Sequence, residues 1–213
     1  LVVAPSGYGL PLRPARGIGE EELRLAFLAG PDERGGIGGL RHLARRLAES
    51  DLPAVFLPGV VHLDTVPAHR KLNRVDMGTS DKVCAAALGI EDQRERTGRR
   101  LEDVSLVLLE LGGAFTAAVA VDRGQIVDGL GGTSGPLGWR AAGALDGEVA
   151  FLAGRIDKGM LFRGGAESVA RHGREARELA LRAYVEGAAK AVLQLRLSAP
   201  DADEVLVSGR GAA

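Results

Sequence analysis

The sequence predicts an α/β protein with a mixed sheet and flanking helices. Three strand-like runs follow one another in the middle of the chain, at 104–111, 115–121 and 125–130, with glycine turns between them. The first run is almost continuously apolar, which is typical of a strand covered on both faces, although a buried helical segment can look alike. Its β-branched residues and the glycines after it favour the strand. Segments with apolar residues at helical spacing lie on both sides of these runs.

The connections between the three runs are rich in glycine. Gly112 and Gly113 end the first run, and 122–124 forms a short hairpin. The glycines that follow are Gly129, Gly131, Gly132, Gly135 and Gly138. Backbone without Cβ atoms can aim several N–H groups at one point, and such concavities bind phosphate. The hydroxyl groups that would add donors or reach a magnesium ion are those of Thr116, Thr133 and Ser134. Plain tight turns are the alternative explanation, because the pattern is neither a Walker A loop nor a dinucleotide fingerprint.

The other elements are predicted from local patterns. Helices are expected at 20–29, 37–50, 79–88 and 167–197, and the charged stretch 91–100 is expected to be an exposed connection. Strands are expected at 1–5, 54–57, 60–63, 148–153 and 205–207. Because the chain starts directly in a predicted strand and stops shortly after another strand runs into a glycine turn, we expect it to be truncated at both ends.

The composition is that of an ordinary globular protein, with 46% hydrophobic and 26% charged residues. A net charge of −1 does not favour binding to nucleic acid or to an anionic membrane. The single cysteine, Cys84, excludes an internal disulfide and is expected to be a small core residue. No apolar run reaches the roughly 18 residues that a membrane span needs. These features predict a cytoplasmic protein.

A dense group of polar side chains follows the run 60–63. Within it, Arg70 and Arg74 lie four residues apart and would share one face if the segment were helical. Paired guanidinium groups suit a carboxylate or a transferred phosphate, whereas a surface cluster of ion pairs with neighbouring aspartates is the alternative. Near the N-terminus, Ser6 and Gly7 follow a predicted strand and would line a substrate pocket, unless they form a plain turn.

Three segments resemble a known family. LVLLELGGAFTAAVAVDRGQIVDGLGGTSGPLG, at 106–138, resembles the second phosphate loop of the acetate/butyrate kinase branch of the actin–hexokinase–sugar kinase superfamily, whose members share ribonuclease H-like ATPase lobes. PSGYGLPL at 5–12 and HRKLNRVDMGTSDKV at 69–83 resemble an uncharacterised, butyrate-kinase-like prokaryotic family. The resemblance implies actin-like lobes, with the remainder of an N-terminal lobe at 1–100 and a C-terminal lobe at 101–213.

The resemblance also implies an activity, namely ATP-dependent transfer of a phosphoryl group to a small carboxylate. VVHLDTVPAH resembles a segment in which an Asp-Thr pair precedes a histidine, so Asp64 is the candidate catalytic and magnesium-binding carboxylate. Arg70 or Arg74 would neutralise the developing charge. The implied substrate-binding residues are Ser6, Gly7, His69 and Asn73. The implied phosphate-binding residues are Gly112, Gly113, Thr116, Gly131, Gly132, Thr133 and Ser134. The implied nucleoside-binding residues are Ser208 and Gly209.

One departure from the family pattern concerns the loop at 131–135. Acetate kinases carry an arginine in this loop, and the present sequence, Gly-Gly-Thr-Ser-Gly, has none. Another arginine must therefore take its place, or the chemistry differs. The alternatives to a kinase are a nucleotide-binding sensor or assembly protein without transfer, and a hydrolase whose base is Asp64 or His69. The expected cofactors are ATP and Mg²⁺, and the expected partners are a nucleotide, a small acceptor and a second copy in a homodimer.

Overall fold

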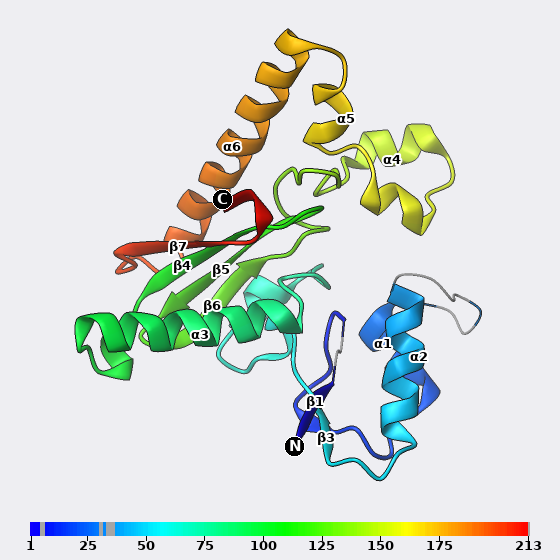
Figure 1. Ribbon diagram of the computed structural model, residues 1–213, viewed down its shortest axis with the longest axis vertical. Coiled ribbons are helices and arrows are strands. Elements are labelled where there is room, and N and C mark those ends of the chain that lie inside the picture. Colours follow the sequence, from blue (N-terminus) through cyan, green and yellow to red (C-terminus); the bar gives the residue numbers. More distant parts are fainter. Residues whose placement is uncertain (5–6, 30–31, 33–36, 213) are drawn as a thin grey trace. The chain divides into compact units, whose positions relative to one another are not determined.

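The structure of the protein is a computed structural model that describes residues 1–4, 7–29, 32 and 37–212. The chain forms two compact units, residues 1–85 and 86–213, which we describe separately. Figure 1 labels most of their helices and strands. The predicted lobe boundary after residue 100 stays a prediction.

The first unit is built around a small sheet with the strand order β1-β3-β2. Strand β1 (Val2–Ala4) is parallel to β3 (Ala54–Phe56), and β2 (Arg13–Pro14) is antiparallel to it. Helices α1 (Glu20–Phe27) and α2 (Ile37–Ala48) contribute apolar side chains to the core next to this sheet. The largest of the buried core side chains are those of Leu23, Phe27 and Phe56.

The second unit contains a four-stranded mixed sheet with the order β6-β5-β4-β7. Strands β4 (Leu106–Leu111), β5 (Thr116–Asp122) and β6 (Gln125–Leu130) form an antiparallel meander, which confirms the three strands predicted from the sequence. Strand β7 (Glu204–Ser208) pairs in parallel with β4.

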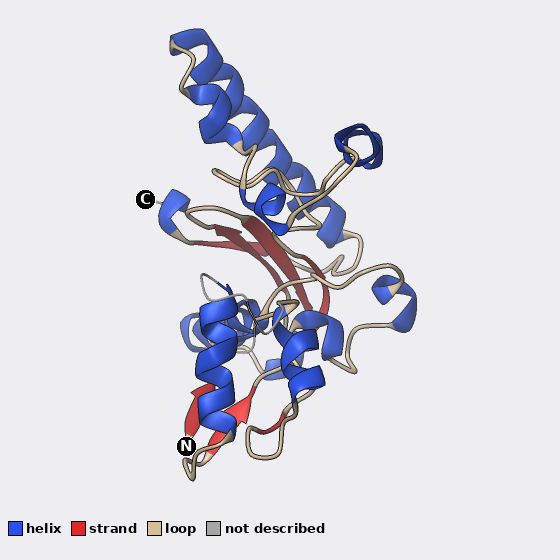
Figure 2. Ribbon diagram, turned by 90° about the vertical axis from the view of Figure 1, so that its right-hand side faces the viewer, coloured by secondary structure: helices blue, strands red, loops and turns tan. Residues whose placement is uncertain are grey.

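Helix α6 (Arg174–Arg196) crosses one face of this sheet, as Figure 2 shows. Its buried residues Ala188, Ala191 and Leu195 join a core with alternate residues of β4 and β5, because residues two apart on a strand point to the same face. The part of α3 (Ser80–Thr97) in the second unit lies near β7: a Cβ at Gly89 would be 2.8 Å from Cδ1 of Leu206. Each face of the sheet is therefore contacted by a helix.

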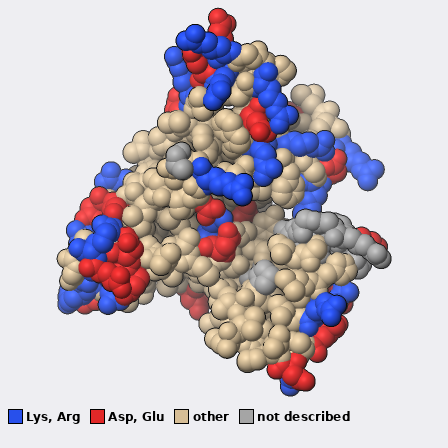
Figure 3. Space-filling view, viewed as in Figure 1, with Lys and Arg blue, Asp and Glu red and all other residues tan. Residues whose placement is uncertain are grey.

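The stretch 91–97 is mostly exposed, as expected, but it continues helix α3 and carries ion pairs instead of forming a connection. The helix continues through Thr97, where Arg96 pairs with Asp92 four residues earlier and with Glu204 of β7. Basic and acidic side chains accordingly lie close together at the left of Figure 3. The predicted helix end near residue 88 is wrong, because pairs spaced three and four residues apart support further helical turns.

Three further predictions of local structure are wrong. The run 60–63 is not a strand: Val60–His62 forms a 3₁₀ helix. The run 148–153 lies in helix α4 (Gly147–Ala153), because the Asp146 carboxylate accepts hydrogen bonds from the first-turn amides and caps it. The long helix predicted at 167–197 is two helices, α5 (Ala166–Ala170) and α6, and they are separated where Gly173 has φ of 111°.

Cys84 is exposed on α3, not buried in the core as predicted. Partial burial of its thiol raises the pKa of Cys84, and the nearby Asp81 carboxylate adds to this. In the described part of the chain, no helix is long and apolar enough to cross a membrane.

Candidate functional site

The turn between β4 and β5 is the starting point of the site. The N–H of Gly112 donates to the carbonyl of Phe115 at 2.9 Å and closes the turn, and a Cβ at Gly112 would lie 2.7 Å from that oxygen. The N–H of Gly113 has no acceptor among the described residues. A Cβ at Gly113 would have only Arg210 within 4 Å, with Cδ at 3.6 Å. Gly112 is therefore required by the turn itself, whereas Gly113 presents an open amide.

A cavity of about 520 Å³ lies in front of this turn. Gly112, Gly113 and Gly211 contribute backbone to its lining. The turn follows the carboxyl end of β4, and Gly211 follows the carboxyl end of the parallel strand β7. Carboxyl ends of parallel strands are the usual place for ligands in open α/β sheets.

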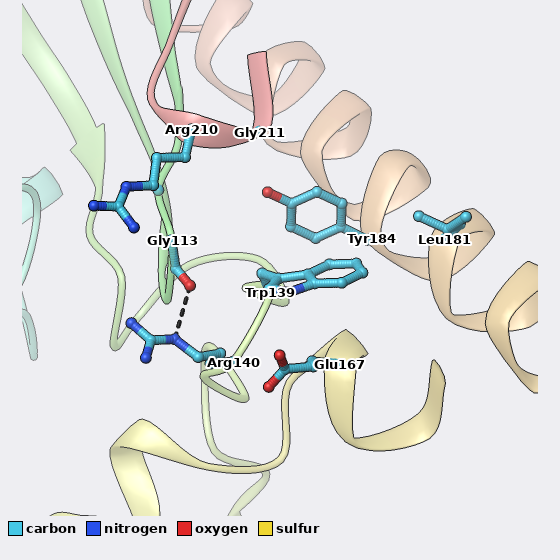
Figure 4. A pocket seen from close by; sticks show the side chains of 9 residues that line it. Gly113, Trp139, Arg140, Glu167, Leu181, Tyr184, Arg210 and Gly211 are labelled. Carbon is cyan, nitrogen blue, oxygen red and sulfur yellow. Dashed lines mark hydrogen bonds between the residues drawn. The ribbon is translucent and has the colours of Figure 1, made fainter. Parts of the chain in front are cut away.

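One wall of the cavity is aromatic. The rings of Trp139 and Tyr184 meet edge to face with centroids 5.9 Å apart, and Leu181 lies one helical turn before Tyr184 on α6 (Figure 4). Tyr184 is 6% exposed, and its hydroxyl is buried with no hydrogen-bond partner within the described chain. A buried hydroxyl is normally paired, so this group suits a ligand that supplies the missing partner.

Charged side chains complete the cavity. Nε of Arg140 donates to the carbonyl of Gly113 at 2.8 Å, which is the dashed line in Figure 4. Arg210 approaches the same glycine from the turn after β7. Glu167 is the acidic member of the lining, and Arg171 pairs with it at 2.7 Å. The site therefore combines an apolar wall, an open amide and two guanidinium groups, a combination that suits an anion carrying an aromatic group.

The second glycine cluster is packed against the rest of the unit. A Cβ at Gly132 would lie 2.6 Å from Cβ of Phe115, one at Gly135 would lie 2.6 Å from the Gly131 carbonyl, and one at Gly138 would lie 2.2 Å from the Ala114 carbonyl. Real Cβ atoms do not approach so closely, so these three positions require glycine for packing alone. Thr133 and Ser134 lie in the same loop, and none of the residues 131–134 lines the cavity. Their predicted role toward phosphate stays a prediction.

Thr116 and Ser208 lie near the cavity without lining it. Thr116 is fully buried and pairs with Leu111 across β4 and β5, and Ser208 pairs with Glu110 across β4 and β7. Neither hydroxyl has a hydrogen-bond partner in the part of the chain that the structure describes. Gly209 has φ of 91° and turns the chain across the end of β4.

The remaining predicted residues belong to the first unit. Asp64, His69 and Asn73 are exposed, and Ser6 lies outside the described residues. Gly7 has φ of 55° and packs against α1, where a Cβ would lie 2.7 Å from the Ala26 carbonyl. The structure thus separates the predicted site residues between its two units.

Arg70 and Arg74 do not share a helix. Arg70 lies within the 3₁₀ segment Ala68–Lys71. Asn73, which has φ of 56°, lies outside that segment and precedes Arg74. Arg74 lines another cavity, of about 360 Å³, together with Tyr8 and His62. Burial lowers the pKa of His62 from its ordinary value of 6.5. Among the described residues, no three His, Cys, Asp or Glu side chains are placed to hold a metal ion.

Comparison with known protein families shows to which family the chain belongs. A family model described as "Protein of unknown function (DUF1464)" matches residues 1–213. The chain belongs to the DUF1464 family. Among curated proteins, no sequence matches this DUF1464 chain.

Solved kinases are similar to this DUF1464 protein in structure. Acetate kinase from Entamoeba histolytica aligns with a TM-score of 0.70 and 12% identity, over 98% of this chain and 62% of that one. Acetate kinase from Porphyromonas gingivalis gives 0.63 and 14%, over 96% and 59%. A propionate kinase from Francisella tularensis subsp. tularensis SCHU S4 gives 0.64 and 17%, over 95% and 60%. The DUF1464 chain spans about three fifths of the length of these kinases.

These similarities show the fold. The predicted α/β class with a mixed sheet and flanking helices is confirmed, and the fold is similar to that of acetate and propionate kinases. The expected resemblance to the acetate kinase branch is confirmed at the level of the fold.

The sequence analysis missed most of the cavity lining. Trp139, Arg140, Glu167, Tyr184 and Gly211 were not among the predicted site residues. The dipeptide Trp139-Arg140 directly after the glycine loop was the one available sign, because the chain has a single tryptophan. Tyr184 gave no sign, because an aromatic residue within a helical pattern is normally a core residue.

Proposed function

We propose that this DUF1464 protein is an ATP-dependent phosphotransferase and that the cavity of the second unit binds the nucleotide. The observation that carries this proposal is the open amide of Gly113 in the same cavity as the aromatic wall of Trp139 and Tyr184. The amide would donate to a phosphate oxygen, and the aromatic and apolar side chains would contact the nucleoside. The kinase folds that the chain resembles support this assignment.

The proposed acceptor is a small carboxylate, as in a butyrate-kinase-like enzyme. Phosphoryl transfer depends mainly on positioning and charge neutralisation, so the protein needs few covalent partners. Asp64 is the proposed magnesium-binding residue, and Arg70 or Arg74 the proposed cation near the transferred group. Mg²⁺ favours one or two carboxylates together with water and phosphate oxygens. Asp64 is an exposed carboxylate and would supply one such ligand.

Binding of ATP can be followed through the single tryptophan. Trp139 lines the cavity, so we expect saturable changes in its fluorescence when ATP is added to the 213-residue chain, with saturation by about 1 mM. Calorimetry provides an independent measurement of the same equilibrium. Absence of binding at millimolar ATP in both assays would contradict the proposal.

Transfer is tested by release of ADP in the presence of Mg²⁺ and a panel of short-chain carboxylates. We expect Asp64→Asn to abolish turnover and to leave the affinity for metal-free ATP unchanged, because the substitution removes a metal ligand but not the cavity. The control is Asp51→Asn, which removes another exposed carboxylate of the same unit, one that pairs with Arg16. Undiminished turnover in Asp64→Asn would remove Asp64 from the mechanism. Tight binding without turnover on any acceptor would favour a nucleotide-binding sensor instead.

A further inference from the structure

The loop at 131–135 lacks the arginine expected from the resemblance, and its glycines are used for packing. A phosphate at Gly113 would still need cations, because a polyanion cannot be held by one amide and an apolar wall. The cavity supplies two of them, Arg140 and Arg210, from segments 70 residues apart in the sequence. In Figure 4 both guanidinium groups lie to the left of Gly113, that of Arg210 above its carbonyl oxygen and that of Arg140 below.

The backbone of Arg140 is held firmly. Its N–H donates to the carbonyl of Ala114 at 3.0 Å, and its own carbonyl accepts from the N–H of Gly165 at 2.9 Å. Nε of its side chain is bonded to the Gly113 carbonyl. Because one donor is used to orient the guanidinium plane, the two terminal nitrogens remain directed away from that carbonyl and available to an anion.

Arg210 is placed by the turn that follows β7. Gly209 has φ of 91°, and a Cβ there would lie 2.4 Å from the carbonyl of Leu111. A Cβ at Gly211 would lie 3.0 Å from Cβ of Leu111 and 3.2 Å from the Tyr184 hydroxyl. The two glycines let the chain cross closely over the end of β4, and Arg210 is thereby brought to within contact of Gly113.

Neither guanidinium group is paired with a carboxylate of the described second unit. Within residues 86–212, Arg140 and Arg210 have no carboxylate partner, and the acid in the cavity, Glu167, is paired with Arg171. Other arginines of this unit, including Arg96 and Arg99, do pair with carboxylates. Two unneutralised guanidinium groups beside an open amide are suited to phosphate, which accepts charge-assisted hydrogen bonds from all three.

We propose that Arg140 and Arg210 form a clamp on the phosphate groups of the bound nucleotide and replace the arginine that the glycine loop lacks. Arg140 is the preset arm, because its side chain is already bonded to Gly113. Arg210 closes the other side from the turn after β7. This inference rests on the proposed nucleotide site and adds the residues that recognise its phosphates.

The test compares ligands with and without phosphate on the 213-residue chain. Affinities for ATP, tripolyphosphate and adenosine are measured by calorimetry for the wild type and for Arg140→Ala, Arg210→Ala and Arg140→Lys. The control variant is Arg177→Ala, which removes an exposed arginine of α6 that does not line the cavity. Circular dichroism confirms that each variant is folded.

We expect each alanine variant to lose about tenfold in affinity for ATP and tripolyphosphate, the scale of a hydrogen bond to a charged group. Arg140→Lys should recover part of the loss, because lysine keeps the charge but not the planar fork. Adenosine affinity should be unchanged in all variants, which a merely structural role of either arginine would not produce. Arg177→Ala should bind all three ligands like the wild type.

The outcomes separate the clamp from the nucleotide site. If the wild type binds ATP and both alanine variants bind it equally well, the clamp is refuted and the nucleotide site stands. If the wild type binds tripolyphosphate through both arginines but binds ATP no better, the clamp stands and the nucleotide site is refuted. If the wild type binds neither, both proposals are refuted. Equal losses for ATP and adenosine would also refute the clamp.

Discussion

Gly132→Ala tests whether the second glycine cluster serves packing. The added Cβ would lie 2.6 Å from Cβ of Phe115, 2.7 Å from its Cγ and 2.8 Å from its Cδ1. Rotation of the Phe115 ring cannot relieve the first of these contacts, because Cβ is fixed by the backbone. The ring also meets Phe162 edge to face, with centroids 5.3 Å apart. The loop or strand β5 must therefore move.

The size of the effect follows from the contact distances. Forcing a methyl group into a packed site destabilises the fold by about 1–3 kcal/mol. Alanine also restricts the unfolded chain more than glycine does, and this offsets about 0.4–1 kcal/mol of the loss. We expect a net loss of about 1–2 kcal/mol in the free energy of unfolding. For a chain of this length, this corresponds to a decrease in Tm of roughly 2–8 °C.

The measurement is urea denaturation followed by Trp139 fluorescence, which reports on the second unit. The matched control is Gly147→Ala in α4, where the added Cβ meets no atom within 4 Å. Its free energy of unfolding should be unchanged or higher by up to about 1 kcal/mol, because alanine favours helix over glycine. A Gly132→Ala protein within about 0.5 kcal/mol of the wild type would refute the packing explanation.

Two other perturbations test the polar groups. The pKa of His62 is lowered by burial, so the unfolded chain binds more protons between that lowered pKa and the ordinary value of 6.5. The contribution of neutral His62 to the free energy of unfolding of the first unit should be fully present above pH 6.5. It should decrease as the pH falls through this window. This loss should disappear in His62→Gln and persist in His69→Gln, as measured by denaturation under far-UV circular dichroism; an identical pH dependence in both variants would contradict it. Tyr184→Phe should leave the free energy of unfolding unchanged or raise it by up to about 1 kcal/mol, because the hydroxyl has no partner in the described chain, yet weaken ATP binding severalfold in the fluorescence assay. Equal ATP affinity would show that this hydroxyl does not face the ligand.

Local patterns predicted the central meander well. The runs 104–111, 115–121 and 125–130 correspond to β4, β5 and β6 within two residues at each end. A hydrophobic run bounded by glycines carries this information within a few residues. The predictions failed where a neighbouring residue decided the conformation, as at α4, which the Asp146 side chain caps.

The roles of individual glycines could not be predicted. The sequence shows Gly113 and Gly132 as similar residues in similar turns, but their surroundings differ. A Cβ at Gly113 would make an ordinary van der Waals contact with Arg210, whereas a Cβ at Gly132 would overlap Phe115. Whether bare backbone is open to a ligand or filled by a neighbour depends on atoms that are distant in the sequence.

The sequence alone determined the three strands of the central meander, the turns between them and the absence of an arginine at 131–135. These properties depend on residue types and on spacings of a few residues, so they can be read before folding. Only the tertiary structure decided that Arg140, Tyr184 and Arg210 meet around Gly113. Pairing of β7 with β4 and packing of α6 on the sheet bring these three side chains together, and both arrangements join segments that are distant in the sequence.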